Sequence, residues 1–268
     1  MSTKFRPEIN GLPPLRPGQL AGIEANQRAP VLIVGMHNSG TSILAEILHK
    51  SGVFLGNNMS HYESYFFSVF INDRLIMGSD QSWASLPLMS IQDVMSCRDT
   101  VGPFVTRHWI ADYLECGYDG VSMWGIKDPR LCVLLPLYLE IFPDAKVVHI
   151  RRNPDDVAAS LCRRKKHGVG KLDDFGHWKQ LSLDYTDRVI EYSGKASAYF
   201  ELEYETFCRQ SEPVIRNLFE FLDLPFTSET QALLTKVTPA RIGSYEKYQK
   251  GGRERFPMIA RRLFGKTR

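Results

Sequence analysis

The sequence contains few cysteines, and their spacing matches no paired motif. They are odd in number and none forms a C-x-x-C pair: Cys97, Cys116, Cys132, Cys162 and Cys208. Such a set indicates neither a disulfide framework nor a zinc site. We therefore expect no metal site, and a reducing compartment, the cytoplasm, as the location of the protein.

The chain also lacks long hydrophobic runs and a large excess of one charge. No run approaches the length of a membrane span, and residues 1–30 contain scattered prolines and charges in place of the apolar stretch of a signal peptide. The 33 basic and 30 acidic residues leave a net charge of only +3, which does not indicate nucleic-acid binding. We expect neither a transmembrane segment nor a nucleic-acid partner.

The sequence does contain a repeated alternation of apolar strands and amphipathic helices. Its 268 residues are 43% hydrophobic, enough for a substantial core. Strands are predicted at 31–34, 122–126, 146–150 and 198–202, and helices after each of them as well as near 60–77 and 106–117. This alternation predicts an α/β fold with three layers, αβα, around a central parallel sheet. Residues 1–29 are expected to form an irregular arm ahead of a single domain over 30–268.

Residues 35–42, Gly-Met-His-Asn-Ser-Gly-Thr-Ser, have the outline of a nucleotide phosphate-binding loop that lacks its lysine. Thr41 stands where the lysine belongs. The loop lies between a predicted strand and a predicted helix, so that backbone N–H groups and the positive end of the helix dipole would meet at an anion. Without a lysine for the β/γ-phosphates, the loop predicts a phosphate ligand that has no triphosphate tail. Taken alone, it is equally compatible with an ordinary strand-to-helix turn.

A second candidate phosphate site follows the predicted strand at 146–150. Arg152 stands directly before Asn153 and Pro154, a pair that predicts a capped helix start, and Ser160 lies two turns further along that helix. An arginine binds phosphate oxygens with two parallel donors, and a serine hydroxyl adds another. The alternative is an ion pair between Arg152 and a following aspartate, with Ser160 in solvent. Ligands of open α/β sheets bind at the carboxyl ends of the strands, so we expect both sites in one crevice.

A phosphate loop without lysine and an Arg…Ser clamp after a later strand resemble the sulfotransferases that use 3′-phosphoadenosine 5′-phosphosulfate (PAPS). The resemblance covers about residues 31–226 and implies a P-loop NTPase-like sulfotransferase fold, with PAPS as co-substrate and no metal. It implies that the 5′-phosphosulfate is held by the loop, whose candidate residues are His37, Asn38, Ser39, Gly40, Thr41 and Ser42. The family's R-N-P-x-D-V-x-x-S element implies that Arg152 and Ser160 hold the 3′-phosphate. Tyr204 begins a Y-E element that is also similar to the family's and completes this binding set.

The K-D-P sequence at 127–129 is similar to an element of tyrosylprotein and many bacterial sulfotransferases. The resemblance implies that Lys127 is the catalytic cation, which steadies charge on the sulfuryl group and its leaving phosphate. Glu63 resembles the glutamate that bacterial members carry after the first helix, and its carboxylate could accept the proton of the acceptor hydroxyl. His61 and His37 are competing candidate bases, because imidazole titrates closest to neutrality.

One departure from the family's pattern lies at Asn38, where related loops carry a basic residue. Asparagine donates a hydrogen bond but supplies no charge, so Lys127, Arg130 or a residue of the C-terminal tail would have to supply more of the stabilisation. The tail resembles, only in part, the R-K-G element that contacts the 3′-phosphate in cytosolic members. This adds Lys250 and Arg253 as candidate binding residues.

The sequence does not specify the acceptor: a small molecule, glycan, lipid or peptide with a hydroxyl or amine all fit. Several aromatic residues are candidates for an apolar acceptor pocket or for the core: Tyr62, Tyr65, Phe66, Phe67 and Trp83. Two other functions stay open, a P-loop-type kinase and a non-catalytic nucleotide-binding protein. Preference for ATP with Mg²⁺ would favour the first, and binding without transfer the second.

Overall fold

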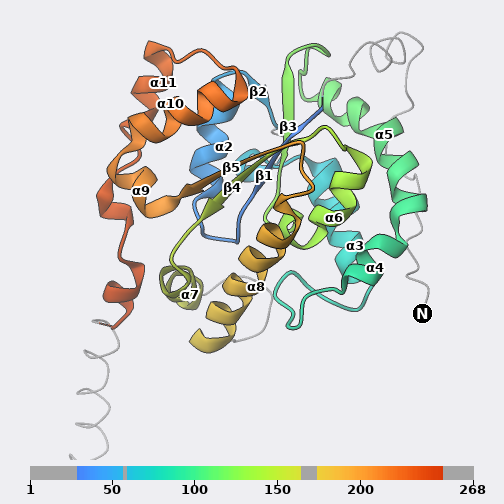
Figure 1. The fold of residues 1–268 in the computed structure, drawn as a ribbon, viewed down its shortest axis with the longest axis horizontal. Coiled ribbons are helices and arrows are strands. Elements are labelled where there is room, and N and C mark those ends of the chain that lie inside the picture. Colours follow the sequence, from blue (N-terminus) through green and yellow to red (C-terminus); the bar gives the residue numbers. More distant parts are fainter. Residues whose placement is uncertain (1–28, 57–58, 164–173, 250–268) are drawn as a thin grey trace, which may run out of the picture.

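The computed structural model describes residues 29–56, 59–163 and 174–249, and its centre is a parallel five-stranded sheet (Figure 1). The strands are β1 (Val31–Val34), β2 (Val53–Phe54), β3 (Met123–Lys127), β4 (Lys146–Arg151) and β5 (Ala198–Glu203), in the spatial order β2-β3-β1-β4-β5. The four predicted strands are confirmed to within one residue. Strand β2 was not predicted, because two residues are too few to show a period.

Helices surround this sheet on both faces. In chain order they are α2 (Thr41–Lys50), the 3₁₀ turn η1 (Ser60–Tyr62), the π-helix η2 (Phe66–Asp73), α3 (Arg74–Met77), α4 (Ile91–Ser96), α5 (Arg98–Glu115), α6 (Leu131–Ile141), α7 (Pro154–Arg163), α8 (Phe175–Ser193), α9 (Tyr204–Arg209), α10 (Ser211–Leu222), α11 (Ser228–Leu234) and the 3₁₀ turn η3 (Pro239–Arg241). In Figure 1, α10 and α11 lie near α2 on one side, and α3 to α6 lie on the other.

The alternation of side chains along β1 explains why two layers of helices are needed. Val31 and Ile33 belong to a core cluster with α2, α9, α10 and α11. Leu32 and Val34 point to the opposite face and pack with residues of η2 and of α3 to α8. Successive side chains of a strand point to opposite faces, and all of β1 is buried. The predicted three-layer αβα fold is thereby confirmed.

Local sequence predicted some helix ends and missed others. Asn153 Oδ1 accepts the N–H of Asp155 at 2.8 Å and α7 begins at Pro154, as predicted. Before α6, Asp128 makes the equivalent contact, with Oδ1 accepting the N–H of Arg130 at 2.9 Å, and a turn then leads into the helix at Leu131. The helix predicted near 106–117 begins at Arg98 and runs through Pro103, since buried neighbours override the local preference for a break there.

The remaining expectations about the ends of the chain are not decided by this fold. The irregular arm expected over 1–29 lies outside the described residues except at Ala29, and Lys250 and Arg253 lie outside them as well. The single domain over 30–268 stays a prediction. Within the described ranges, no helix combines the length and the apolar character that a membrane crossing requires.

Candidate active site

The carboxyl ends of the strands surround one open cavity of about 490 Å³. Because the strands are parallel, the segments after β1, β3, β4 and β5 meet at the same edge of the sheet. The cavity is lined by eleven of the predicted site residues: His37, Asn38, Gly40, Thr41, Ser42, His61, Glu63, Lys127, Arg152, Ser160 and Tyr204. Ser39 is almost fully buried within the loop. The structure therefore brings the two candidate phosphate sites and the K-D-P element into one crevice.

The loop after β1 presents hydrogen-bond donors toward an anion site. Its turn is closed by a bond from Ser39 N–H to the Met36 carbonyl at 3.0 Å. Gly40 precedes α2 and offers no side-chain cap to that helix, whose first turn contains no acidic residue. Thr41 and Ser42 of that turn line the cavity, so the positive end of the helix dipole lies beside it. Asn38 Nδ2 and Ser39 Oγ are buried and have no hydrogen-bond partner among the described residues. Buried polar groups are normally paired, and Asn38 lines the cavity whereas Ser39 does not, so the Asn38 amide is the donor that fits a phosphate or sulfate oxygen there.

Arg152 joins the end of β4 to this loop. Its Nη1 donates to the Asn38 carbonyl at 2.8 Å, and its guanidinium lies over the Tyr204 ring, 4.5 Å from the centroid. Its side chain is largely buried, and its Nη2 lies 3.8 Å from Asp156 Oδ2. This is a long ion pair of the kind that the sequence offered as the alternative role of Arg152. Ser160 lines the same cavity, and Arg152 Nε has no partner among the described residues. Arg152 also lines the cavity, so part of its side chain faces the space that a ligand would occupy.

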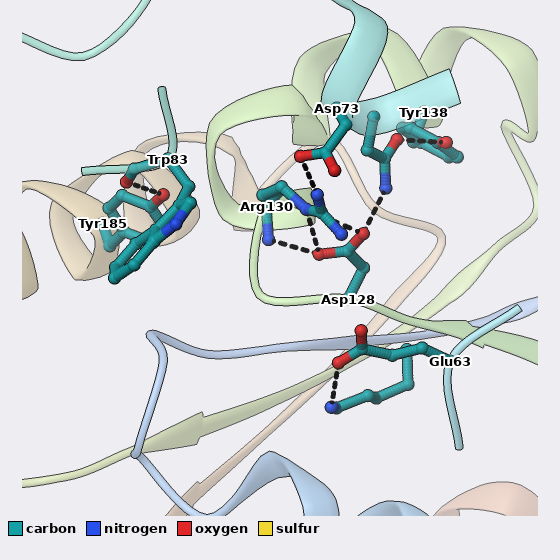
Figure 2. A network of polar contacts seen from close by, with 9 residues as sticks. Glu63, Asp73, Trp83, Asp128, Arg130, Tyr138 and Tyr185 are labelled. Carbon is teal, nitrogen blue, oxygen red and sulfur yellow. Dashed lines mark hydrogen bonds and ion pairs between the residues drawn. The ribbon is translucent and has the colours of Figure 1, made fainter. Parts of the chain in front are cut away.

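Lys127 and Glu63 form a close ion pair in the cavity wall (Figure 2). Lys127 Nζ donates to Glu63 Oε1 at 2.6 Å and lies 3.4 Å from Ser42 Oγ of the loop, while the lysine side chain is only 2% exposed. Burial and the nearby Asp128 carboxylate raise the pKa of the Glu63 carboxyl above its ordinary value, against the opposing effect of Lys127. The site thus combines a buried cation beside the loop with a carboxylate suited to accept a proton.

A polar network behind Lys127 fixes the segment that carries it. Figure 2 shows Asp128 between Arg130 and the neighbouring helix: Arg130 Nε donates to Asp128 Oδ1 at 2.9 Å, and Asn72 Nδ2 donates to Asp128 Oδ2 at 2.9 Å. Arg130 also contacts Asp73, and Tyr138 OH donates to Asn72 Oδ1 at 2.7 Å. Complete burial raises the pKa of Asp128, but Arg130 and these hydrogen bonds outweigh it and hold the pKa below its ordinary value.

This network corrects one expectation about the charge that Asn38 lacks. Arg130 does not line the cavity and is engaged by two carboxylates, so it is no substitute for a basic loop residue. Lys127 does line the cavity and contacts the loop. Of the cations named for that role within the described residues, Lys127 is the one in position.

The candidate aromatic and histidine residues separate into site and core. Phe66 and Phe67 are fully buried in the core, whereas Trp83 lines the cavity. The Trp83 ring lies 4.1 Å from the ring of His37, between centroids, and its carbonyl accepts the Tyr185 hydroxyl at 2.6 Å. His61 also lines the cavity but is exposed to solvent.

Sequence reasoning missed one cation of the cavity wall, Arg241. It belongs to η3 and lines the cavity together with Arg152, which is 89 positions earlier in the chain. No motif surrounds it in the sequence, and its proximity to Arg152 arises only from the return of the chain after α11. A periodicity or capping signal could not have revealed it.

Comparison with known proteins gives one family. A model described as the sulfotransferase family matches residues 30–228. An uncharacterized protein of Aquifex aeolicus (strain VF5) is 25% identical over 245 residues, which cover 87% of this chain and 30% of that protein. The chain therefore spans less than a third of the length of this relative.

Solved structures are similar in fold. Sulfotransferase STF9 from Mycobacterium avium superposes with a TM-score of 0.53 at 17% identity, covering 81% of this chain and 69% of that chain. The sulfotransferase domain of the Synechococcus PCC 7002 olefin synthase gives a TM-score of 0.52 at 18% identity, covering 84% and 89%. At such identities the likeness concerns the fold alone.

Proposed function

The chain belongs to the sulfotransferase family, and from that premise we propose that it transfers a sulfuryl group from PAPS to a hydroxyl or amine of an acceptor. The observation that carries the proposal is the Lys127–Glu63 pair, which shares one cavity with the phosphate-binding loop and Arg152. A cation, a base and two anion sites in one crevice are the groups that such a transfer requires.

Two anion sites in the cavity are proposed to bind the two ends of the donor. The N–H groups at the start of α2, with Asn38 Nδ2, would bind the 5′-phosphosulfate, because Asn38 lines the cavity and its amide has no partner among the described residues. Arg152 and Ser160 would bind the 3′-phosphate. Tyr204, under the Arg152 guanidinium, would support that arginine.

Lys127 and Glu63 divide the chemistry of the proposed transfer. Glu63 accepts the proton of the acceptor hydroxyl or amine as the new bond to sulfur forms. Lys127 stabilises the negative charge that develops on the phosphate oxygen when its bond to sulfur breaks. Lys127 Nζ lies 3.4 Å from Ser42 Oγ, so its positive charge is beside the loop, where Asn38 supplies no charge.

The acceptor is proposed only by its reacting group. Trp83 gives the cavity wall an aromatic face, while Ser60 and His61 give it polar groups. Small molecules, glycans, lipids and peptides with a hydroxyl or amine are all compatible with such a wall.

The transfer is tested with ³⁵S-labelled PAPS and a metabolite extract, followed by mass spectrometry of every product that becomes sulfated. We expect transfer by the wild-type protein, and a loss on the order of a hundredfold or more in both Lys127→Ala and Glu63→Gln. Both variants should still bind adenosine 3′,5′-bisphosphate (PAP). Labelling by ATP with Mg²⁺ instead of PAPS would identify a kinase, and binding without transfer to any acceptor would identify a non-catalytic protein.

A further inference from the structure

A segment far along the chain closes one end of the cavity. We call residues 239–245 the strap; it contains η3 and follows α11. Arg241 of the strap lines the cavity, and Ser244 is buried against the domain. The strap therefore contributes to the wall of the donor site although it lies outside residues 30–228, the part matched by the family model.

One carboxylate fixes the backbone of the strap. Asp156, in the first turn of α7, accepts the N–H of Gly243 on Oδ2 at 3.0 Å and the N–H of Tyr245 on Oδ1 at 2.7 Å. The Asp156 residue is only 6% exposed. Hydrogen bonds to a buried charged acceptor are stronger than neutral ones, so Asp156 holds both ends of the turn around Ser244.

Arg152 holds the same segment from the side of the cavity. Its Nη2 donates to Ser244 Oγ at 3.0 Å and to the Arg241 carbonyl at 3.3 Å. Burial raises the pKa of Tyr204 to about 12, and the charges of Arg152 and Arg241 act against this rise. Arg152 lies over the Tyr204 ring, and Arg241 lines the same cavity as both of them.

We propose that Asp156 is a positioning residue for recognition of the donor: by docking the strap it places Arg241 beside Arg152 as a second cation for the 3′-phosphate. The inference rests on the proposed function and adds to it a second cation for the 3′-phosphate and the residue that positions that cation. A simple counter-ion role makes the opposite prediction. A negative charge 3.8 Å from Arg152 opposes phosphate binding, so its removal would then tighten binding.

The test compares two neighbouring aspartates with two nucleotides. Calorimetry gives the dissociation constants of PAP and of 5′-AMP, which lacks the 3′-phosphate. The constant for 5′-AMP divided by the constant for PAP measures how much the 3′-phosphate contributes to binding. In Asp156→Asn one carboxylate oxygen becomes an NH₂ donor that faces a backbone N–H, so the ratio should fall on the order of tenfold. Asp155→Asn is the control, because Asp155 pairs with Lys179 on the surface and should leave the ratio unchanged.

Arg241→Gln keeps the test valid if Asp156→Asn does not fold, since Arg241 is exposed to solvent. It should lower the same ratio on the order of tenfold, and Asp156→Asn should add little in that background because both act through one cation. An unchanged or higher ratio in Asp156→Asn or in Arg241→Gln overturns this inference and leaves the proposed function intact. A wild-type ratio near one rejects the 3′-phosphate clamp of the proposed function, and the inference with it.

Discussion

At the residue scale, burial and a neighbouring cation shift the pKa of the Glu63 carboxyl in opposite directions. Burial raises its pKa, Lys127 at 2.6 Å lowers it, and the buried Asp128 carboxylate raises it again, which leaves the pKa above its ordinary value of 4.5. A base is most effective when its pKa approaches the working pH. The same contact holds the Lys127 ammonium group in the wall of the cavity, beside the loop.

The pH dependence of transfer tests this assignment. Glu63 must be ionised to accept a proton, and its folded-state pKa is raised, so kcat/KM should fall as the pH decreases through a value above 4.5. A pH series of kcat/KM measures this acidic limb. Glu63→Gln should lose the limb together with most of the activity, whereas His61→Gln should retain it. An acidic limb that persists in Glu63→Gln would assign the base elsewhere.

At the scale of the elements, the site depends on the close approach between the loop and α9. Gly40 has a φ of 101° and lies against the ring of Tyr204, so that an added Cβ would overlap that ring. On the other side of the cavity, the bond from Asn72 to Asp128 ties η2 to the segment after β3. These contacts set the position of the loop and of Lys127 relative to one another.

Gly40→Ala should therefore weaken PAP binding and destabilise the fold by about 2 kcal/mol or more, through backbone strain and the overlap with Tyr204. Gly117→Ala is the matched control: Gly117 has a similar φ of 92°, but an added Cβ would meet nothing within 4 Å. In Gly117→Ala the free energy of unfolding should fall only by the contribution of backbone strain, and PAP binding should be unchanged. Urea unfolding and calorimetry of both variants check this. Equal effects of the two substitutions on PAP binding would contradict it.

At the scale of the whole molecule, the parallel sheet determines where a ligand can bind. Among the residues that the structure describes, helices cover both faces of β1, and the cavity lies at the carboxyl edge of the sheet beside the loop. A ligand bound there would contact segments from β1, β4 and the strap at once. Because such a ligand binds the folded protein and not the unfolded chain, its binding raises the free energy of unfolding.

PAP should consequently raise the melting temperature by several degrees at about a hundredfold excess over its Kd, equivalent to about 2.7 kcal/mol. Arg152→Ala should remove most of this shift, measured relative to its own ligand-free melting temperature. Arg216→Ala is the control, because Arg216 also lies over an aromatic ring, that of Phe226, but does not line the cavity. Equal shifts in wild type and Arg152→Ala would refute the clamp.

The sequence by itself determined the features that depend on near neighbours in the chain. Apolar runs predicted β1, β3, β4 and β5, the Asn153-Pro154 pair predicted the start of α7, and the loop at 35–42 indicated an anion site. These signals are local because strand burial, helix capping and turn geometry each involve only a few consecutive residues. They were sufficient for the fold class, whereas the family came from the resemblance of the loop and of the Arg152…Ser160 element to known sulfotransferases.

Only the tertiary structure decided which distant side chains meet. Lys127 and Glu63 are 64 positions apart, and Arg152 and Arg241 are 89 apart. Arg130 follows Lys127 closely in the chain but points into a network with Asp128 and Asp73 instead of the cavity. Such pairings depend on how the parallel sheet aligns its strand ends and on how the chain returns over them, and no period or spacing in the sequence encodes that packing.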